Sequence, residues 1–456
     1  MFVDTVYQNR RRILKHKTGS GLIWLQGNHL IGINYPDNAF PFRQDSNFLY
    51  YTGITTPGLH LLIDIDEDEE YLVGNDLTID ETIWVGDLPT LEEQATNAGI
   101  TKVISLENLP EKIKAAVNSN RKIHTLPPYH GYQKEAIRTW IDDAHEPSTD
   151  LIHSIIQMRS IKEDREIREI ENALGITAQL HQVVLESCTA GRTEQEIYAK
   201  AMETVLREGG RLAYSAIVTT EGQTLHINTY DNQLKEGQLL LCDMGAENQM
   251  HYASDITRTF PVNHTFTSRQ KEIYQIVLDT LKKSTASIRP GIEFKEVHFR
   301  ASANITEGLK SIGLLQGDTE EIVNKGAHAL FFPHGLGHML GLDVHDMEGL
   351  GETFVGYNSE TQRSETFGTA NLRLGRKLEK HHTITIEPGI YFIPQLIHAW
   401  ESEKKFEEHI NYAKLSDWLD FGGIRIEDDV LVTTDGHRVL GPSIPKEIEE
   451  IEAYRS

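Results

Sequence analysis

Short apolar runs separated by polar turns dominate the first third of the chain. Three of these runs have the length of strands: 21–28, 59–66 and 70–74. Two further segments carry apolar residues at helical spacing: 111–120 and 132–144. The acidic run from Asp66 to Glu70 falls between the second and third strands, where a solvated hairpin tip is expected. This alternation predicts a mixed sheet flanked by helices.

A long amphipathic helix is expected next, starting near Ser160. Ile167, Ile170, Leu174 and Ala178 recur at intervals of three and four residues, and Val184 and Cys188 continue this apolar stripe. Acidic residues lie in the first turns, where the helix dipole favours them. A second helix follows Gly191 and ends at Gly209. We therefore place a domain boundary at about 155, between an N-terminal domain (1–155) and a C-terminal domain (156–456).

From residue 215 onward the pattern changes to strands and tight turns. The runs 238–246 and 250–260 are separated by a few polar residues, which predicts a hairpin. Two more strands are expected: 382–392 and 422–432. Two helices are expected between these pairs: 267–287 and 293–312. The polar insertion 348–376 is long for a compact domain, and such loops are often functional.

Composition and charge narrow the functional classes. A chain of 456 residues is long enough for two cores. The formal net charge of −24 argues against nucleic acid or an anionic membrane surface as the main partner. No stretch has the length of a membrane span, and Met1–Arg12 lacks the apolar core of a secretory signal. With only two cysteines, a reduced, cytoplasmic setting is expected.

Four carboxylates stand out in the strands of the second domain. Asp243 and Asp255 lie on either side of the predicted hairpin turn and would approach each other across adjacent strands, unless one of them faces solvent. Glu387 and Glu427 lie among β-branched residues, where a buried carboxylate needs a cation or a donor. With one imidazole, these four side chains would suit two divalent ions, Mn²⁺ first, with Co²⁺, Fe²⁺ or Zn²⁺ as alternatives. A water bridging such a pair could act as a hydroxide nucleophile.

The segment HGLGHMLGLDVHD (334–346) supplies three histidines. Each of them could bind a metal, carry a proton or contact a substrate. The segment alone does not distinguish these roles.

Five sequence blocks occur together in a familiar order. The first is FPFRQDSNFLYYTGI in the N-terminal domain, and the others are LLLCDMGA with ASDITRTF, HGLGHMLGLDVHD, TIEPGIYF and GGIRIEDDV. In these blocks the chain resembles the pita-bread metallopeptidases, and within them the prolidases (Xaa-Pro dipeptidases) and aminopeptidases P. The resemblance implies a small α/β domain of the creatinase and prolidase N-terminal type with a mixed sheet, followed by a pita-bread α+β catalytic domain.

The resemblance also implies a role for each site residue. Five residues would be the ligands of two metals: Asp243, Asp255, His338, Glu387 and Glu427. Asp255 and Glu427 would bridge the ions, and Glu387 would also act as general acid and base. His345 would face the substrate carbonyl. His334 and His226 would line the pocket.

Arg425 lies two residues before Glu427 and would pair with a ligand carboxylate, or else form a surface salt bridge. The resemblance implies cleavage of the bond before proline and leaves two substrate classes open. A dipeptidase needs a cation for the carboxylate of proline, and Arg373 lies where prolidases carry that arginine. The insertion 348–376 is longer than the connection typical of aminopeptidases P, and the segment 392–429 resembles bacterial prolidases more closely. We therefore predict an Xaa-Pro dipeptidase, with an Xaa-Pro aminopeptidase acting on longer peptides as the alternative.

The resemblance further implies a homodimer or a dimer of dimers, with Trp84 of one subunit against the pocket of its neighbour. Core packing is the alternative for Trp84. Other hydrolase and nucleotide-binding classes are disfavoured, because the sequence has no G-x-S-x-G, HExxH or P-loop motif. A peptide-binding module of the same fold without activity is a remote alternative, because such relatives have lost metal ligands.

Overall fold

The computed structural model describes residues 1–263 and 265–454. The chain divides into two compact units, Met1–Met158 and Arg159–Ser456. The predicted boundary at 155 falls inside helix α7 (Thr149–Ser160). Among the described residues, no helix combines the length and the apolar character that crossing a membrane requires.

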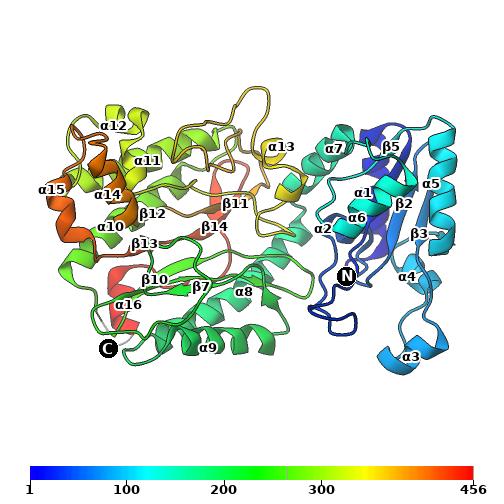
Figure 1. Ribbon diagram of the computed structural model, residues 1–456, viewed down its shortest axis with the longest axis horizontal. Helices are drawn as coiled ribbons and strands as arrows, with labels where there is room; N and C mark the ends of the chain where they lie inside the picture. The colour runs from blue at the N-terminus through cyan, green and yellow to red at the C-terminus, as the bar shows by residue number, and fades with distance from the viewer. Residues whose placement is uncertain (264, 455–456) are drawn as a thin grey trace. The chain divides into compact units, whose positions relative to one another are not determined.

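The first unit is built on a five-stranded mixed sheet in the order β4-β3-β2-β1-β5 (Figure 1). Its strands are β1 (Leu22–Gln26), β2 (His60–Asp64), β3 (Glu69–Val73), β4 (Lys102–Ile104) and β5 (Ile123–His124). β1, β2 and β3 are antiparallel neighbours, whereas β4 and β5 join the two edges in parallel. The first three strands and the β2–β3 hairpin confirm the prediction from the apolar runs.

Helices cover this sheet and close its core. The covering elements are α1 (Asp4–Thr18), α2 (Ser46–Thr52), α4 (Leu91–Asn97), the 3-10 turn η1 (Leu106–Asn108), α5 (Leu109–Asn118) and α6 (Gly131–Trp140). The short helix α3 (Ile79–Val85) has no buried residue and takes no part in this core. Leu109 and Ile113 of α5 and Ile137 of α6 pack against Trp24 and Leu62 of the strands. The apolar faces of α5 and α6 thus lie on the sheet, as their helical spacing predicts.

The second unit contains several small antiparallel sheets. The larger two have the orders β10-β8-β7 and β11-β14-β15, and the smaller two pair β12 with β13 and β6 with β9. The strands are β6 (Arg211–Leu212), β7 (Ile217–Thr219), β8 (Leu239–Asp243), β9 (Ala246–Glu247), β10 (Thr257–Pro261), β11 (Thr383–Ile386), β12 (Gly389–Tyr391), β13 (Gly423–Arg425), β14 (Asp428–Val432) and β15 (His437–Val439). The predicted hairpin is the β8–β10 pair, in which Asp243 lies opposite Thr257.

Helices surround these sheets (Figure 1). They are α8 (Asp164–Ser187), α9 (Glu194–Arg207), α10 (Ser268–Ser287), α11 (Phe294–Ser311), α12 (Thr319–Lys325), α13 (Glu352–Gly356), α14 (Pro394–Ser402), α15 (Tyr412–Leu415) and α16 (Ile448–Tyr454), with the 3-10 turns η2 (Ala327–Leu330), η3 (Glu348–Leu350) and η4 (Ser416–Trp418). The predicted start of the long helix at Ser160 is wrong. Ser160 ends α7, and α8 begins after Glu163, whose side chain forms a capping box with Glu166.

Two predicted strands are each interrupted at a glutamate. The run 382–392 is divided into β11 and β12, and the run 422–432 into β13 and β14. Pro388 follows Glu387 and has no N–H for a strand ladder. The Glu427 N–H donates instead to the Thr257 carbonyl at 3.0 Å. Each glutamate therefore occupies a break in a strand, where its side chain need not follow the alternation of the sheet.

The segment from 334 to 346 runs beside β11. The Thr385 N–H donates to the His338 carbonyl at 3.0 Å, and the Glu387 N–H donates to the Leu336 carbonyl at 2.8 Å. A Cβ at position 337 would overlap the Thr385 carbonyl, so glycine is needed there for this close approach.

Candidate active site

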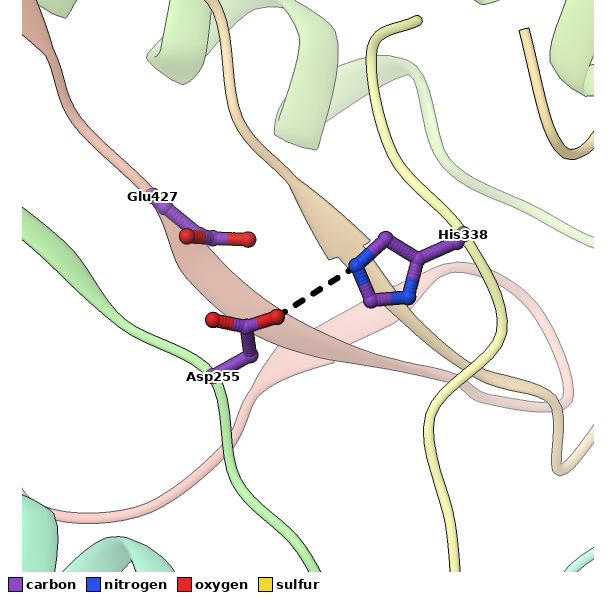
Figure 2. Close-up of side chains that lie close together, drawn as sticks. All are labelled: Asp255, His338 and Glu427. Carbon is purple, nitrogen blue, oxygen red and sulfur yellow. Dashed lines mark ion pairs between the residues drawn. The ribbon is translucent and has the colours of Figure 1, made fainter. Parts of the chain in front are cut away.

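Three predicted ligands form the centre of a buried cluster. Side-chain ligand atoms of Asp255, His338 and Glu427 all lie within 4.8 Å of one another. Figure 2 shows the three side chains pointing toward a common space, with His338 Nε2 3.3 Å from an Asp255 carboxylate oxygen. Asp255 precedes β10, Glu427 lies between β13 and β14, and His338 comes from the loop beside β11.

The other two predicted ligands adjoin this centre. The Tyr214 hydroxyl lies 2.7 Å from an Asp243 carboxylate oxygen and 2.5 Å from an Asp255 carboxylate oxygen. Glu387 Oε1 is 3.9 Å from His338 Nε2. All five predicted ligands therefore belong to one cluster. Tyr214 was not predicted, because a single tyrosine in the mostly apolar segment 211–218 looks like an ordinary packing residue.

The electrostatics of this cluster suit a group of cations. Burial, together with the charges of neighbouring carboxylates, raises the pKa of Glu387 to about 7 and that of Glu427 well above its usual value. Burial also raises the pKa of Asp243, although the nearby Arg425 opposes this shift. Carboxylates crowded in this way cannot all ionise without a positive partner. Four carboxylates and one imidazole are a donor set that suits two divalent ions, so the residues present fit the predicted metal centre.

Arg425 connects this cluster to His334. Its guanidinium forms an ion pair with the Asp243 carboxylate, and Nη1 donates to the Tyr391 hydroxyl oxygen at 2.9 Å. Because arginine only donates, the Tyr391 O–H is left to donate to His334 Nε2, which lies 2.8 Å away. His334 Nδ1 then carries the proton and donates to the Gly335 carbonyl at 2.8 Å. Burial and the nearby Arg425 charge lower the pKa of His334 to about 3, so this imidazole is neutral.

The cluster lies at the wall of a pocket of about 1070 Å³ within the second unit. The pocket is lined by all the predicted site residues of this unit: His226, Asp243, Asp255, His334, His338, His345, Arg373, Glu387, Arg425 and Glu427. Phe367 and Asn371 of the insertion and Leu396 and Ala399 of α14 also line it. This volume is at the upper end of ordinary ligand sites. Trp84 belongs to the other unit, where its side chain is 86% exposed on α3, so core packing is excluded.

His345 and Arg373 share one carboxylate. The His345 ring stacks on the ring of His338 with a centroid distance of 3.9 Å. His345 Nδ1 is 3.0 Å from Glu348 Oε2, and Arg373 Nη1 donates to the same oxygen at 2.6 Å. Arg373 Nη1 also donates to Glu352 Oε1 at 3.0 Å. Neither Glu348 nor Glu352 was predicted, because acidic residues in a polar insertion are usually solvated.

A buried ion cluster anchors the residue that follows His345. Asp346 Oδ1 lies 2.6 Å from Arg159 Nη2, and Asp346 Oδ2 lies 2.8 Å from Lys162 Nζ. The three side chains are at most 2% exposed. Arg159 and Lys162 come from the corner between α7 and α8. The loop that carries His345 is thus tied to this corner by two buried cations.

Comparison with known proteins identifies the family. The sequence profile of metallopeptidase family M24 matches residues 168–434, which is more than half of the chain. The chain belongs to this family. The profile of the aminopeptidase P N-terminal domain matches residues 6–124. The protein is therefore a metallopeptidase of family M24, with an N-terminal domain of the aminopeptidase P type that contains a mixed sheet.

Relatives that match nearly the whole chain include probable Xaa-Pro aminopeptidases. A probable Xaa-Pro aminopeptidase from Coccidioides posadasii is 32% identical over 445 residues, which are 95% of this chain and 92% of that protein. One from Aspergillus niger is 32% identical over 454 residues, covering 98% and 91%.

Solved structures agree with these relatives. Proline aminopeptidase P II from Yersinia pestis has a TM-score of 0.83 at 28% identity, covering 100% of this chain and 99% of that one. A zinc-substituted E. coli aminopeptidase P in complex with product has a TM-score of 0.82 at 28% identity, covering 100% and 98%. The predicted two-domain fold with a pita-bread catalytic domain is confirmed. The main functional prediction, a dipeptidase, is not supported, and the alternative, an aminopeptidase, fits better.

Proposed function

We propose that this protein is a metal-dependent Xaa-Pro aminopeptidase, which removes the first residue from peptides whose second residue is proline. The observation that carries the proposal is the cluster of four carboxylates and one imidazole, with the buried Asp255, His338 and Glu427 at its centre, at the wall of a pocket of about 1070 Å³. The names of the relatives support the same substrate class. A pocket of this size has room for residues beyond the proline.

Two divalent ions would be held by the five clustered side chains: Asp243, Asp255, His338, Glu387 and Glu427. Asp255 and Glu427, whose ligand atoms lie near each other and near His338, would be shared between the ions. Mn²⁺ is the first expectation, with Co²⁺, Fe²⁺ or Zn²⁺ as alternatives, because oxygen donors predominate. When bound, such ions supply Lewis acidity at the scissile carbonyl and lower the pKa of water.

The protein's own residues would position the substrate and move its protons. At the pocket wall, Glu387 Oε2 lies 3.7 Å from His334 Nδ1, and Glu387 Oε1 lies 3.9 Å from His338 Nε2. From this position Glu387 would carry a proton from the attacking water to the proline nitrogen. The proton allows that nitrogen to leave as a neutral amine rather than as an anion. His345 would face the substrate carbonyl and the oxyanion that develops from it. His226 and the neutral His334 would line the part of the pocket beside the proline.

We propose that Trp84 contacts the pocket of a second subunit. Helix α3 has no buried residue, and Trp84 lies exposed on it with Ile79 and Ile83. We propose that this apolar helix meets a neighbouring copy in a homodimer or a dimer of dimers. A Trp84→Ala variant that leaves both the oligomeric state and the KM for peptides unchanged would remove Trp84 from the site.

A paired assay tests the proposed activity. Metal-depleted protein is reconstituted with Mn²⁺ and given Gly-Pro and Gly-Pro-Xaa peptides, with Gly-Ala-Xaa and N-acetylated Gly-Pro-Xaa as controls. We expect release of glycine from Gly-Pro-Xaa alone among the tripeptides, with a higher kcat/KM than for Gly-Pro. Faster cleavage of the dipeptide would return the assignment to a dipeptidase. Equal cleavage of the acetylated peptide would exclude an aminopeptidase.

A further inference from the structure

We propose that Glu348 and Glu352 determine substrate length by neutralising Arg373, so that the pocket disfavours a carboxylate next to the proline ring. This inference rests on the proposed aminopeptidase function and explains how its pocket would discriminate against dipeptides. The three residues come from the insertion 348–376. Glu352 and Arg373 line the pocket, and Glu348 contacts the lining residues Arg373 and His345.

The local charges balance without a substrate. Arg373 donates to Glu348 at 2.6 Å and to Glu352 at 3.0 Å. Arg363 Nη1 donates to the other carboxylate oxygen of Glu352, Oε2, at 2.5 Å. Two guanidinium groups and two carboxylates give a net charge of zero. An Arg373 without these partners would attract a carboxylate, whereas the paired arginine adds no net positive charge.

A dipeptide and a longer peptide differ at this place in one charge. The proline of a dipeptide ends in a carboxylate, whereas the proline of a longer peptide ends in a neutral amide. The carboxylate would enter a pocket that is already lined by Asp243, Glu387 and Glu352, with Glu348 directly behind Arg373. It would also have to compete with Glu348 and Glu352 for Arg373, so like-charge repulsion lowers its affinity. The neutral amide avoids this penalty.

The remaining contacts of these glutamates guide the choice of variants. Glu348 also accepts from His345 Nδ1 at 3.0 Å, so its removal by alanine would disturb His345 as well. Glutamine keeps a carbonyl acceptor for His345 and loses only the charge. Glu360 offers a matched control, because it belongs to the same insertion but forms an exposed ion pair with Lys377 at 2.9 Å, and it does not line this pocket.

The experiment compares kcat/KM for Gly-Pro and Gly-Pro-Xaa in wild type, E348Q/E352Q and E360Q, each with Mn²⁺ restored. We expect the ratio of dipeptide to tripeptide activity to rise about three- to tenfold in E348Q/E352Q, because Arg373 is one-third exposed and water screens its charge. The ratio should stay at the wild-type value in E360Q. Adding R373M to the double variant should abolish the gain, because the freed arginine is its cause.

A second measurement, which needs only the single variant E352Q, tests the same proposal if the double variant folds poorly. L-Proline and L-prolinamide differ only in the carboxylate, and their inhibition constants can be compared in wild type and in E352Q alone. We expect E352Q to favour L-proline relative to wild type. An unchanged ratio in both assays would refute the role of the glutamates. The substrate preference of the wild type tests the proposed function separately, since it does not depend on these variants.

Discussion

The buried partners of Asp346 allow a sharp test of how the loop that carries His345 is held. In a Lys162→Met variant, the ammonium that lies 2.8 Å from Asp346 is replaced by an apolar group of similar length. The Arg159 carbonyl also loses a donor at 2.7 Å. Because Lys162 and Asp346 are each 1% exposed, solvent cannot replace the lost partner. Leaving a buried charge without any partner costs about 3–5 kcal/mol of folding free energy, and this range is an upper bound here because Arg159 still pairs with Asp346.

The effect should extend to catalysis because Asp346 directly follows His345. The Asp346 side chain also accepts from the Asp343 N–H at 3.3 Å, and its own N–H donates to the Met339 carbonyl at 2.9 Å. A displaced carboxylate would therefore move the whole turn. We expect kcat for Gly-Pro-Xaa to fall about 10–100-fold with little change in metal content, since small misplacements of a catalytic group are costly.

Urea unfolding gives the stability, and steady-state kinetics with metal analysis give the function. Arg11→Met is the matched control, because Arg11 is a buried cation paired with Glu70 at 2.6 Å in the other unit. It should lower stability and leave kcat unchanged. If Lys162→Met unfolds at the wild-type urea concentration, the ion cluster does not stabilise the loop. If it loses stability but keeps full kcat, the cluster does not position His345.

Three further predictions follow from the geometry. Burial lowers the pKa of His298 from its usual 6.5 to about 3. Near and below pH 6.5 the unfolded chain therefore binds more protons than the folded chain, and the free energy of unfolding falls as the pH drops from 7.5 to 5.5. His298→Phe should reduce that loss by about 1.4 kcal/mol in urea titrations at the two pH values, and an unchanged loss would contradict the neutral imidazole. His338→Ala should lower metal occupancy, whereas His345→Ala should keep the metals and lower kcat about 10²–10⁴-fold; equal metal loss in both variants would refute this division. Removing divalent metal with a chelator should abolish peptidase activity and lower the midpoint of thermal unfolding, and Mn²⁺ should restore both. An unfolding midpoint that the chelator leaves unchanged would argue against a buried metal centre.

Much of the fold was predictable because its signals are local. The apolar runs of β1, β2 and β3 and the stripes of α8 and α10 are readable in windows of ten to twenty residues. The carboxylates of the site were predictable for a related reason. A charged residue inside an apolar run such as the one before Glu387 is rare without a partner, so the sequence itself indicates that something compensates it.

The contacts that tune the site were not predictable, because they join distant segments. Arg159 and Asp346 are 187 residues apart, and nothing in either segment indicates the other. Glu348 looks like any exposed acid until Arg373 and His345 are placed beside it. The strand breaks at Glu387 and Glu427 were also missed, since a pattern of apolar residues does not show where a ladder is interrupted.

The site residues come from distant segments of the chain, and this separation has a consequence for folding kinetics. Arg425 and Asp243 are 182 residues apart, and their ion pair joins the end of β8 to β13 across this long stretch of chain. Contacts between such distant segments form slowly, because a long loop must close first. The carboxylates also repel one another as they converge. We therefore expect assembly of the cluster to be the last slow step of refolding, and divalent ions to accelerate that step without changing the earlier collapse of the helices.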